Sequence, residues 1–289
     1  MRLIFIRHGD PDYEHDDLTP KGQREAELLA PRMAAVKNIK EIYLSPFGRA
    51  QATARPTLKL LGREGVTLPW LREFNYRIAD PLTGRIHVPW DLPPEYYTNE
   101  PIFYDKDHWY EAPLYQNNPE IAENAPAAYR GLDDLLASYG YVRHGDDAYY
   151  TVSEPASPKD TATEAADAGS SAPDQRTSAG RSIIPAADRP NFNHDYHPTD
   201  EDETLLFFCH LGAELLLVGH LLGISPVPLW HGIYTAPTAV TVLNEERRYH
   251  DNAIFRIQVL GDTSHLAYGG EPVSYSGAFG PVWQESDRS

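Results

Sequence analysis

Short apolar runs alternate with amphipathic stretches near the start of the chain. Residues 3–6 (LIFI) combine β-branched and aromatic side chains, which predicts a short buried strand. A helix is predicted after it, because Thr19 can cap the first turn and Pro20 fits the first helical position. One face of this helix carries the apolar residues Ala26, Leu29, Ala30 and Met33. A strand followed by a helix is the first half of a βαβ unit.

The same order of elements recurs further along the chain. Residues 42–44 form a second apolar run, which is followed by a helical stretch, 49–61, and by a third short run, 67–71. Residues 204–210 (TLLFFCH) predict another buried strand, and 212–222 predict an apolar helix directly after it. Repeated strand–helix units predict a mostly parallel sheet with helices on its faces.

Two later stretches complete the predicted sheet. Residues 238–243 and 253–260 are separated by a polar turn and predict a hairpin at the edge of the sheet. The predicted fold class is therefore α/β, a three-layer α/β/α sandwich with a mostly parallel central sheet. Its catalytic core is predicted to be discontinuous, comprising residues 1–73 and 204–268.

The middle of the chain departs from this alternation. Residues 74–152 are rich in aromatic side chains and prolines and are interpreted as an inserted cap, or substrate subdomain, with its own small core. The clearest helix of this insert is predicted at 121–139. Residues 153–203 predict a low-complexity, disordered acidic loop, because large apolar side chains are sparse there. The tail, 269–289, is predicted to be irregular.

Charge and cysteine content restrict the possible partners and location. The chain has 289 residues and a formal net charge of −17, so we expect neither a nucleic acid nor a membrane as partner. The first apolar run is four residues long, far short of a signal-peptide core, and no stretch is long enough to span a bilayer, so we expect neither a signal peptide nor a membrane span. Cys209, the only cysteine, is interpreted as a buried structural residue. We therefore expect a cytoplasmic protein without a disulfide framework.

The candidate chemistry lies where the predicted strands end. Arg7, His8 and Gly9 follow the first strand, Arg49 follows the second, and His210 ends the late strand. Because ligands of open α/β sheets bind outside the carboxyl ends of the strands, we expect these residues to lie close together. A guanidinium binds phosphate oxygens, an imidazole can act as nucleophile, acid or base, and glycine lets the backbone approach a ligand. The sequence therefore predicts a pocket for a tetrahedral oxyanion, with phosphate as its natural occupant.

Glu73 follows the third apolar run and can supply the carboxyl group that a leaving oxygen needs. In such a pocket one imidazole attacks phosphorus in line, while the other cationic groups neutralise the charge of the transition state. The spacing of His194, Asp195 and His197 loosely resembles a metal site. That loop offers no fixed partners, so we predict neither a metal nor another cofactor.

The motifs that carry this chemistry are Arg7-His8-Gly9, Leu18-Thr19 with Gly22, Ser45-Pro46 with Arg49 and Thr53-Ala54, the strand ending at His210, and the run 262–266. Together they resemble the histidine phosphatase superfamily, also called phosphoglycerate mutase-like. The matching motifs lie within roughly residues 1–75 and 204–266.

The resemblance implies a phosphohistidine mechanism in which His8 is the nucleophile. Arg7, Arg49 and His210 match the phosphate-binding residues of the family, and Glu73 is the best match to its proton donor. The resemblance thus implies a phosphatase, acting on a small-molecule phosphomonoester.

Two positions depart from the family pattern. Leu211 stands where the family often has glycine, so the backbone after His210 is expected to differ; Leu211 and Gly9 are nevertheless assigned to substrate binding. Glu14 lies near the position where mutases usually carry asparagine, and its charge opposes a phosphorylated sugar acid. A phosphatase is therefore favoured over a phosphoglycerate mutase. A third hypothesis is a regulatory module that binds phosphate with little turnover, and the sequence leaves the physiological substrate and oligomeric state open.

Overall fold

The computed structural model describes residues 1–145, 148–152, 202–247 and 252–274. Its centre is an eight-stranded sheet with the strand order β5-β4-β10-β1-β11-β12-β9-β8. The parallel half comprises β5 (Val66–Thr67), β4 (Ile39–Leu44), β10 (Thr204–Cys209) and β1 (Arg2–Arg7). The antiparallel half comprises β11 (Val240–Arg247), β12 (Asn252–Asp262), β9 (Tyr150–Val152) and β8 (Tyr141–Arg143).

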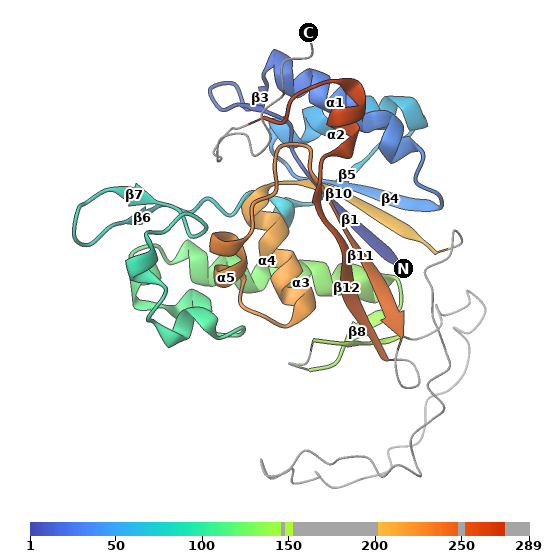
Figure 1. The fold of residues 1–289 in the computed structure, drawn as a ribbon. Helices are drawn as coiled ribbons and strands as arrows, with labels where there is room; N and C mark the ends of the chain where they lie inside the picture. Colours follow the sequence, from blue (N-terminus) through green and yellow to red (C-terminus); the bar gives the residue numbers. More distant parts are fainter. Residues whose placement is uncertain (146–147, 153–201, 248–251, 275–289) are drawn as a thin grey trace, which may run out of the picture.

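Helices cover both faces of the sheet (Figure 1). On one face lie α1 (Pro20–Ala34) and α2 (Gly48–Leu61), with α6 (Ser264–Gly269) beside α1. On the other lie α3 (Glu120–Ser138) and α4 (Leu211–Leu222), with α5 (Pro226–Gly232) against α4. The predicted α/β/α sandwich is thereby confirmed.

The alternation of side chains along β1 explains this layering. Ile4 and Ile6 pack with α1 and α2, whereas Leu3 and Phe5 belong to the apolar cluster that contains α3 and α4. Successive residues of a strand point to opposite faces of the sheet, so a strand between two helical layers is apolar throughout. The run of four apolar residues in the sequence is therefore the signature of a central strand.

The predicted hairpin exists, but its position was predicted wrongly. Strands β11 and β12 form the hairpin, and β11 also pairs with β1, the last strand of the parallel half. Strand β9 then pairs with β12, and β8 forms the edge of the sheet. Because β8 and β9 come from residues 141–152, this end of the predicted insert is part of the central sheet.

The remainder of the insert contains α3 and several short elements. These are the hairpin of β6 (Ile78–Ala79) with β7 (Ile86–His87) and the 3₁₀ turns Pro94–Tyr96, Pro101–Tyr104, Trp109–Glu111 and Pro113–Asn117. The described residues of the insert do not form a core of their own, contrary to the prediction, because Trp109 and Tyr115 belong to the same apolar cluster as Phe5 and Phe207 of the sheet. Helix α3 confirms the helix predicted at 121–139.

Some predictions concern other parts of the chain. The acidic loop at 153–203, including the metal-like spacing at 194–197, lies almost wholly outside the described residues, as does most of the tail. Within the described ranges, none of the helices combines the length and the apolar character needed to span a bilayer.

Candidate active site

Three neighbouring parallel strands bring the predicted site residues together. In the pairing of β1 with β10, Arg7 lies opposite Cys209, so His8 and His210 both follow directly at the ends of their strands. Their ring centroids are 5.1 Å apart. Strand β4 pairs with the other side of β10, and the short connection after it leads into α2, which carries Arg49 in its first turn. Parallel pairing therefore explains why residues far apart in sequence share one edge of the sheet.

The ring of His8 is held in one tautomer. Its Nδ1 lies 2.7 Å from the carbonyl oxygen of Gly9, which can only accept, so the ring proton is on Nδ1 and the lone pair is on Nε2. The side chain is buried, and burial, followed by the charges of Arg7 and Arg49, lowers the pKa of His8 well below its usual value. His8 is thus a neutral imidazole with an unprotonated Nε2.

His210 is fully buried and bonded on one side. Its Nε2 lies 2.7 Å from the hydroxyl oxygen of Ser45, which itself accepts from the backbone N–H of Phe47 at 3.2 Å. Among the described residues, Nδ1 of His210 has no hydrogen-bond partner. Burial and the nearby charges of His8, Arg49 and Arg7 lower the pKa of His210 well below its usual value. When the Ser45 hydroxyl donates to Nε2, the ring offers an unused N–H donor at Nδ1.

Arg7 and Arg49 are buried cations with spare donors. Nη1 of Arg7 donates to the carbonyl oxygen of Thr235 at 2.5 Å, and Nη1 of Arg49 donates to Asp16 at 2.6 Å. Within the described chain, the Nε atom of each has no partner, although both side chains are almost inaccessible to solvent. Buried guanidinium groups with unused N–H donors favour the binding of an anion.

Asp16 is a site residue that the sequence analysis did not identify. Its carboxylate accepts from Arg49 and, at 2.6 Å, from the backbone N–H of Gly48 at the start of α2. Its backbone has a φ of 49°, in the left-handed region that aspartate tolerates. Asp16 therefore offsets part of the positive charge at the edge of the pocket. In the sequence it is one of several acidic residues in the loop, and no local pattern distinguishes it from its neighbours.

Glu73 lies at the N-terminus of α4. Its Oε1 accepts from the backbone N–H groups of Phe74 at 2.8 Å and Ala213 at 3.0 Å. Burial raises the pKa of Glu73, so the protonated acid is favoured more than in water. Because Oε1 is occupied by two donors, the proton of the neutral acid belongs on Oε2.

Gly9 and Leu211 border the site in different ways. The backbone N–H of Gly9 donates to the hydroxyl of Thr53 at 2.9 Å, while its carbonyl binds His8. Leu211 is the first residue of α4 and is buried. The next position, 212, has room only for glycine, because a Cβ there would lie 2.6 Å from Oε1 of Glu73. The predicted substrate contact of Leu211 remains a prediction.

Glu214 and Trp90 are two further residues that the sequence analysis did not identify. Glu214 is fully buried on α4 and accepts from the hydroxyl of Thr235, whose carbonyl binds Arg7. Burial raises its pKa to about 7. Trp90, from the insert, crowds Gly212, since a Cβ there would lie 2.4 Å from Cδ1 of the indole. The indole N–H is buried without a partner in the described residues.

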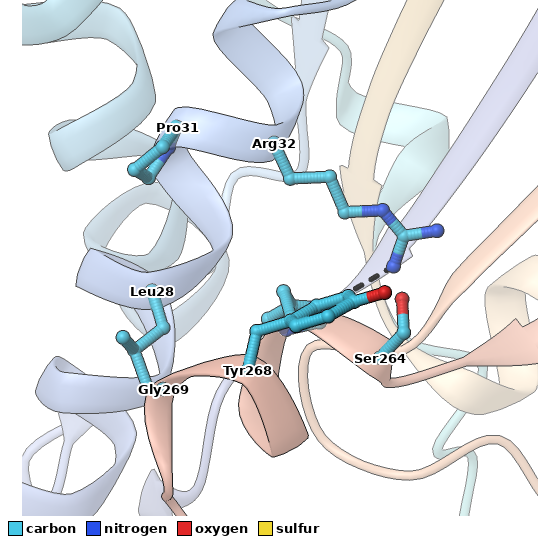
Figure 2. Close-up of a pocket in the computed structure, with 7 residues that line it drawn as sticks. Leu28, Pro31, Arg32, Ser264, Tyr268 and Gly269 are labelled. Atoms are coloured by element: carbon cyan, nitrogen blue, oxygen red, sulfur yellow. Dashed lines mark hydrogen bonds between the residues drawn. The ribbon is translucent and has the colours of Figure 1, made fainter.

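Other candidates lie apart from this arrangement. Cys209 is buried, and burial raises the pKa of its thiol well above its usual value, as expected for a structural residue. The residues described contain no group of three or more His, Cys, Asp or Glu side chains able to hold a metal ion. A groove of about 390 Å³ lies between α1 and α6 (Figure 2), and none of the predicted site residues lines it. Its Arg32 and His265 already bond to Asp262 and Thr238.

Comparison with known proteins identifies the fold and shows a family similarity in the N-terminal part. A phosphoserine phosphatase from Entamoeba histolytica, solved with 3-phosphoglyceric acid, matches with a TM-score of 0.50 at 17% identity, over 92% of this chain and 98% of that one. A mutant of the same phosphatase, solved with phosphoserine, gives a TM-score of 0.49 at 19% identity, again over 92% and 98% of the two chains. The match to the structure with 3-phosphoglyceric acid therefore identifies the fold of this chain.

The sequence of the N-terminal part is similar to a known family. Residues 3–88 match the model of the histidine phosphatase superfamily, branch 1. A probable phosphoglycerate mutase, GpmB, from Yersinia enterocolitica is 30% identical over 89 residues, which cover 28% of this chain and 41% of that protein. The resemblance drawn from the motifs is confirmed, because residues 3–88 match the model of the histidine phosphatase superfamily.

Proposed function

We propose that this chain is a phosphomonoesterase that hydrolyses a small phosphorylated substrate through a phosphohistidine on His8. The observation that carries the proposal is the state of His8, a neutral imidazole whose Nδ1 proton is bound by Gly9 and whose Nε2 is unprotonated. Arg7 and Arg49 flank it as buried cations with spare N–H donors. A nucleophile beside an anion pocket is the arrangement that phosphoryl transfer requires.

In the first step, Nε2 of His8 attacks phosphorus and the bond from phosphorus to the leaving oxygen breaks. Glu73 gives the proton on Oε2 to that oxygen, so the leaving group departs as a neutral alcohol. Arg7, Arg49 and the Nδ1–H of His210 donate to the phosphoryl oxygens, where charge accumulates in the transition state. The products of this step are an alcohol, a phosphohistidine and a Glu73 carboxylate.

In the second step, water replaces the alcohol. The carboxylate of Glu73 takes a proton from the water as its oxygen attacks phosphorus, and the N–P bond to His8 breaks. Inorganic phosphate leaves, and both side chains return to their starting protonation states. A raised pKa suits Glu73 to both steps, because the same group has to give a proton and then accept one.

The insert, residues 74–152, is proposed to recognise the part of the substrate that leaves. Trp90 supports this, because its indole crowds Gly212 next to the Glu73 carboxyl and its N–H is unpartnered within the described part of the chain. The Entamoeba phosphatase was solved with 3-phosphoglyceric acid and, as a mutant, with phosphoserine. We propose a phosphomonoester of similar size as the substrate here, in the cytoplasm, where a single thiol stays reduced.

A phosphoglycerate mutase is the second candidate, favoured by the match to the probable mutase from Yersinia enterocolitica. A mutase would pass the phosphoryl group from His8 back to a sugar acid and exclude water from the second step. Glu14, in the loop that follows His8, is exposed and acidic, which opposes a substrate that carries a carboxylate. This charge is our reason for placing hydrolysis first.

The test is phosphate release from an aryl phosphate, phosphoserine and 3-phosphoglycerate, with product analysis for 2-phosphoglycerate. We expect hydrolysis by the wild type, loss of more than about a thousandfold in His8→Ala, and unchanged rates in His108→Ala, which removes an exposed histidine bonded to Asp105. Transfer to 2-phosphoglycerate without release of phosphate would support the mutase. Binding of phosphate without either reaction would support a regulatory module.

A further inference from the structure

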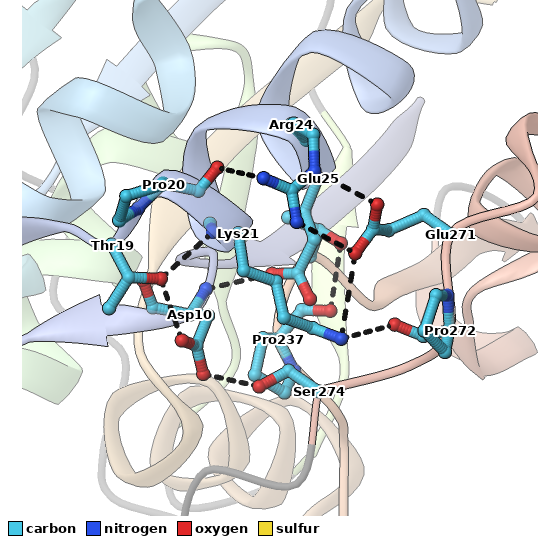
Figure 3. Close-up of polar contacts among 12 residues, drawn as sticks. Asp10, Thr19, Pro20, Lys21, Arg24, Glu25, Pro237, Glu271, Pro272 and Ser274 are labelled. Atoms are coloured by element: carbon cyan, nitrogen blue, oxygen red, sulfur yellow. Dashed lines mark hydrogen bonds and ion pairs between the residues drawn. The ribbon is translucent and has the colours of Figure 1, made fainter.

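One peptide group beside the nucleophile is bonded on both sides. The carbonyl oxygen of Gly9 binds Nδ1 of His8 at 2.7 Å, and the N–H of the same peptide, which belongs to Asp10, donates to Oε2 of Glu25 at 2.8 Å. Figure 3 shows the end of this chain of bonds at Glu25. The peptide therefore links the ring of the proposed nucleophile to a carboxyl group on α1, which the mechanism above does not use.

Close packing of two glycines makes this link possible. A Cβ on Gly22 would lie 2.2 Å from the carbonyl oxygen of Asp10, and a Cβ on Gly9 would lie 2.8 Å from the carbonyl oxygen of Gly22. The loop after β1 thus lies directly against the first turn of α1. Because Glu25 follows Gly22 by three residues on that helix, its side chain lies over the same stretch of loop.

Glu25 has an unusual environment for a carboxyl group. It is fully buried, and its Oε1 has no hydrogen-bond partner among the described residues. The titratable groups that act on it or lie around it are Asp10 in the loop, Lys21 and Arg24 on α1, Tyr234 after α5, and Glu271 after α6. Burial raises the pKa of Glu25 to about 7.

The surrounding polar groups have partners other than Glu25. The carboxylate of Asp10 accepts from the hydroxyls of Thr19 and Ser274, and Lys21 lies 3.6 Å from Glu271 (Figure 3). The direct bond of Glu25 is therefore to the peptide, and a charge on this carboxyl acts on the peptide at short range.

The chemistry at His8 gives such a charge a role. When Nε2 forms a bond to phosphorus, the ring gains positive charge and its Nδ1–H becomes a stronger donor. A carboxylate on the N–H side of a peptide polarises the group and makes its carbonyl oxygen a stronger acceptor, as in other chains of hydrogen bonds. A neutral side chain could satisfy the N–H of Asp10 equally well, so only the charge of Glu25 distinguishes this role from a structural one.

We propose that Glu25 is a positioning residue that acts on His8 through the peptide between Gly9 and Asp10, stabilising the charge that the ring gains on phosphorylation. The proposal rests on the phosphohistidine mechanism proposed above. Glu25, a residue of α1 outside the pocket, would then help to set the reactivity of the nucleophile.

The test compares Glu25→Gln, which keeps an acceptor for the N–H of Asp10, with Glu271→Gln, which removes the same charge nearby without touching the peptide. The rate of enzyme phosphorylation by an aryl phosphate is measured by rapid quench over a range of pH. In the wild type the rate should rise as the pH passes about 7, where Glu25 ionises. Glu25→Gln should lack this rise and should be phosphorylated about tenfold more slowly, whereas the rate of the control should be nearly unchanged.

A second readout needs no turnover. In protein labelled with ¹⁵N-histidine, the Nδ1 proton signal of His8, assigned by its absence from His8→Ala, should shift in Glu25→Gln and stay in place in the control. Equal phosphorylation rates and an unmoved signal would overturn the role of Glu25. If the wild type forms no phosphoenzyme, the mechanism fails and the proposed role fails with it, while the signal still reports whether the link exists. If Glu25→Gln does not fold, titration of the wild-type signal decides, because the link predicts a midpoint near pH 7.

Discussion

Replacement of Glu73 by glutamine separates the proposed acid from its structural surroundings. Glutamine has nearly the same shape, and its Oε1 can still accept from the N–H groups of Phe74 and Ala213. Burial raises the pKa of Glu73, so glutamine also resembles the neutral form that the pocket favours. We therefore expect Glu73→Gln to fold with a melting temperature no lower than that of the wild type, while it cannot give up a proton.

The expected size of the effect depends on the leaving group. A positioned general acid contributes about 10²–10⁴-fold to proton transfer, or roughly 3–5 kcal/mol of the barrier, and an alkyl alcohol needs that proton most. A phenol with electron-withdrawing substituents departs as a stable anion and needs it least. Phosphorylation of His8 by an alkyl phosphate should therefore slow by that range in Glu73→Gln, whereas phosphorylation by such an aryl phosphate should slow far less.

The assay has to follow phosphorylation itself, by burst or single-turnover kinetics, because dephosphorylation of His8 can limit the steady-state rate for both substrates. In the wild type, the rate with the alkyl phosphate should fall as the pH rises through the raised pKa of Glu73, since the acid must be protonated to act. Equal slowing of the two phosphorylation steps would refute this reasoning, and the proton donor would then have to be another group.

Three other predictions follow from the packing around the site. In Gly22→Ala, the new Cβ would lie 2.2 Å from the carbonyl oxygen of Asp10, so chemical denaturation should show a loss of about 1–3 kcal/mol; an unchanged stability would contradict this contact. Trp90→Phe should raise KM about three- to tenfold at unchanged stability, whereas a constant KM would exclude the indole N–H from substrate binding. The pKa of Glu214 in the folded protein is about 7, above its ordinary value of 4.5. The stability that the protonated side chain contributes is therefore fully present below pH 4.5 and is lost as the pH rises through 7. Glu214→Gln should thus gain stability over the wild type at about pH 8 but not at about pH 4, and parallel pH profiles of unfolding free energy would rule this out.

Local patterns were sufficient to predict the parts of the fold that depend on local sequence. The buried strand at residues 3–6 and the helix after Thr19 were predicted correctly, because apolar runs and capping residues act within a few positions. The edge of the sheet was predicted wrongly, because β8 and β9 are three residues each and exist through pairing with β12 and with each other. Such short strands leave little pattern in the sequence.

The same distinction applies to the site. His8 and His210 could be placed together from the sequence because each ends an apolar strand, and the ends of parallel strands converge. Glu25 looks like a solvated helix residue until the tertiary fold buries it against Asp10. Glu214 left a signal that could have been used, since it is a charged residue within an otherwise apolar stretch. Trp90 could not be placed, because its contact with Gly212 joins the insert to a distant helix.

The measurement that tests the central claim most directly is identification of the phosphorylated residue. Wild-type protein mixed with an aryl phosphate is quenched in alkali, where phosphohistidine survives, and examined by mass spectrometry of its peptides and by ³¹P NMR. Because Nδ1 of His8 is bonded to the Gly9 carbonyl, we predict a phosphoryl group on Nε2 of His8 that forms and decays at rates matching turnover. Turnover with the phosphoryl group on His210, or with no phosphorylated residue at all, would contradict it.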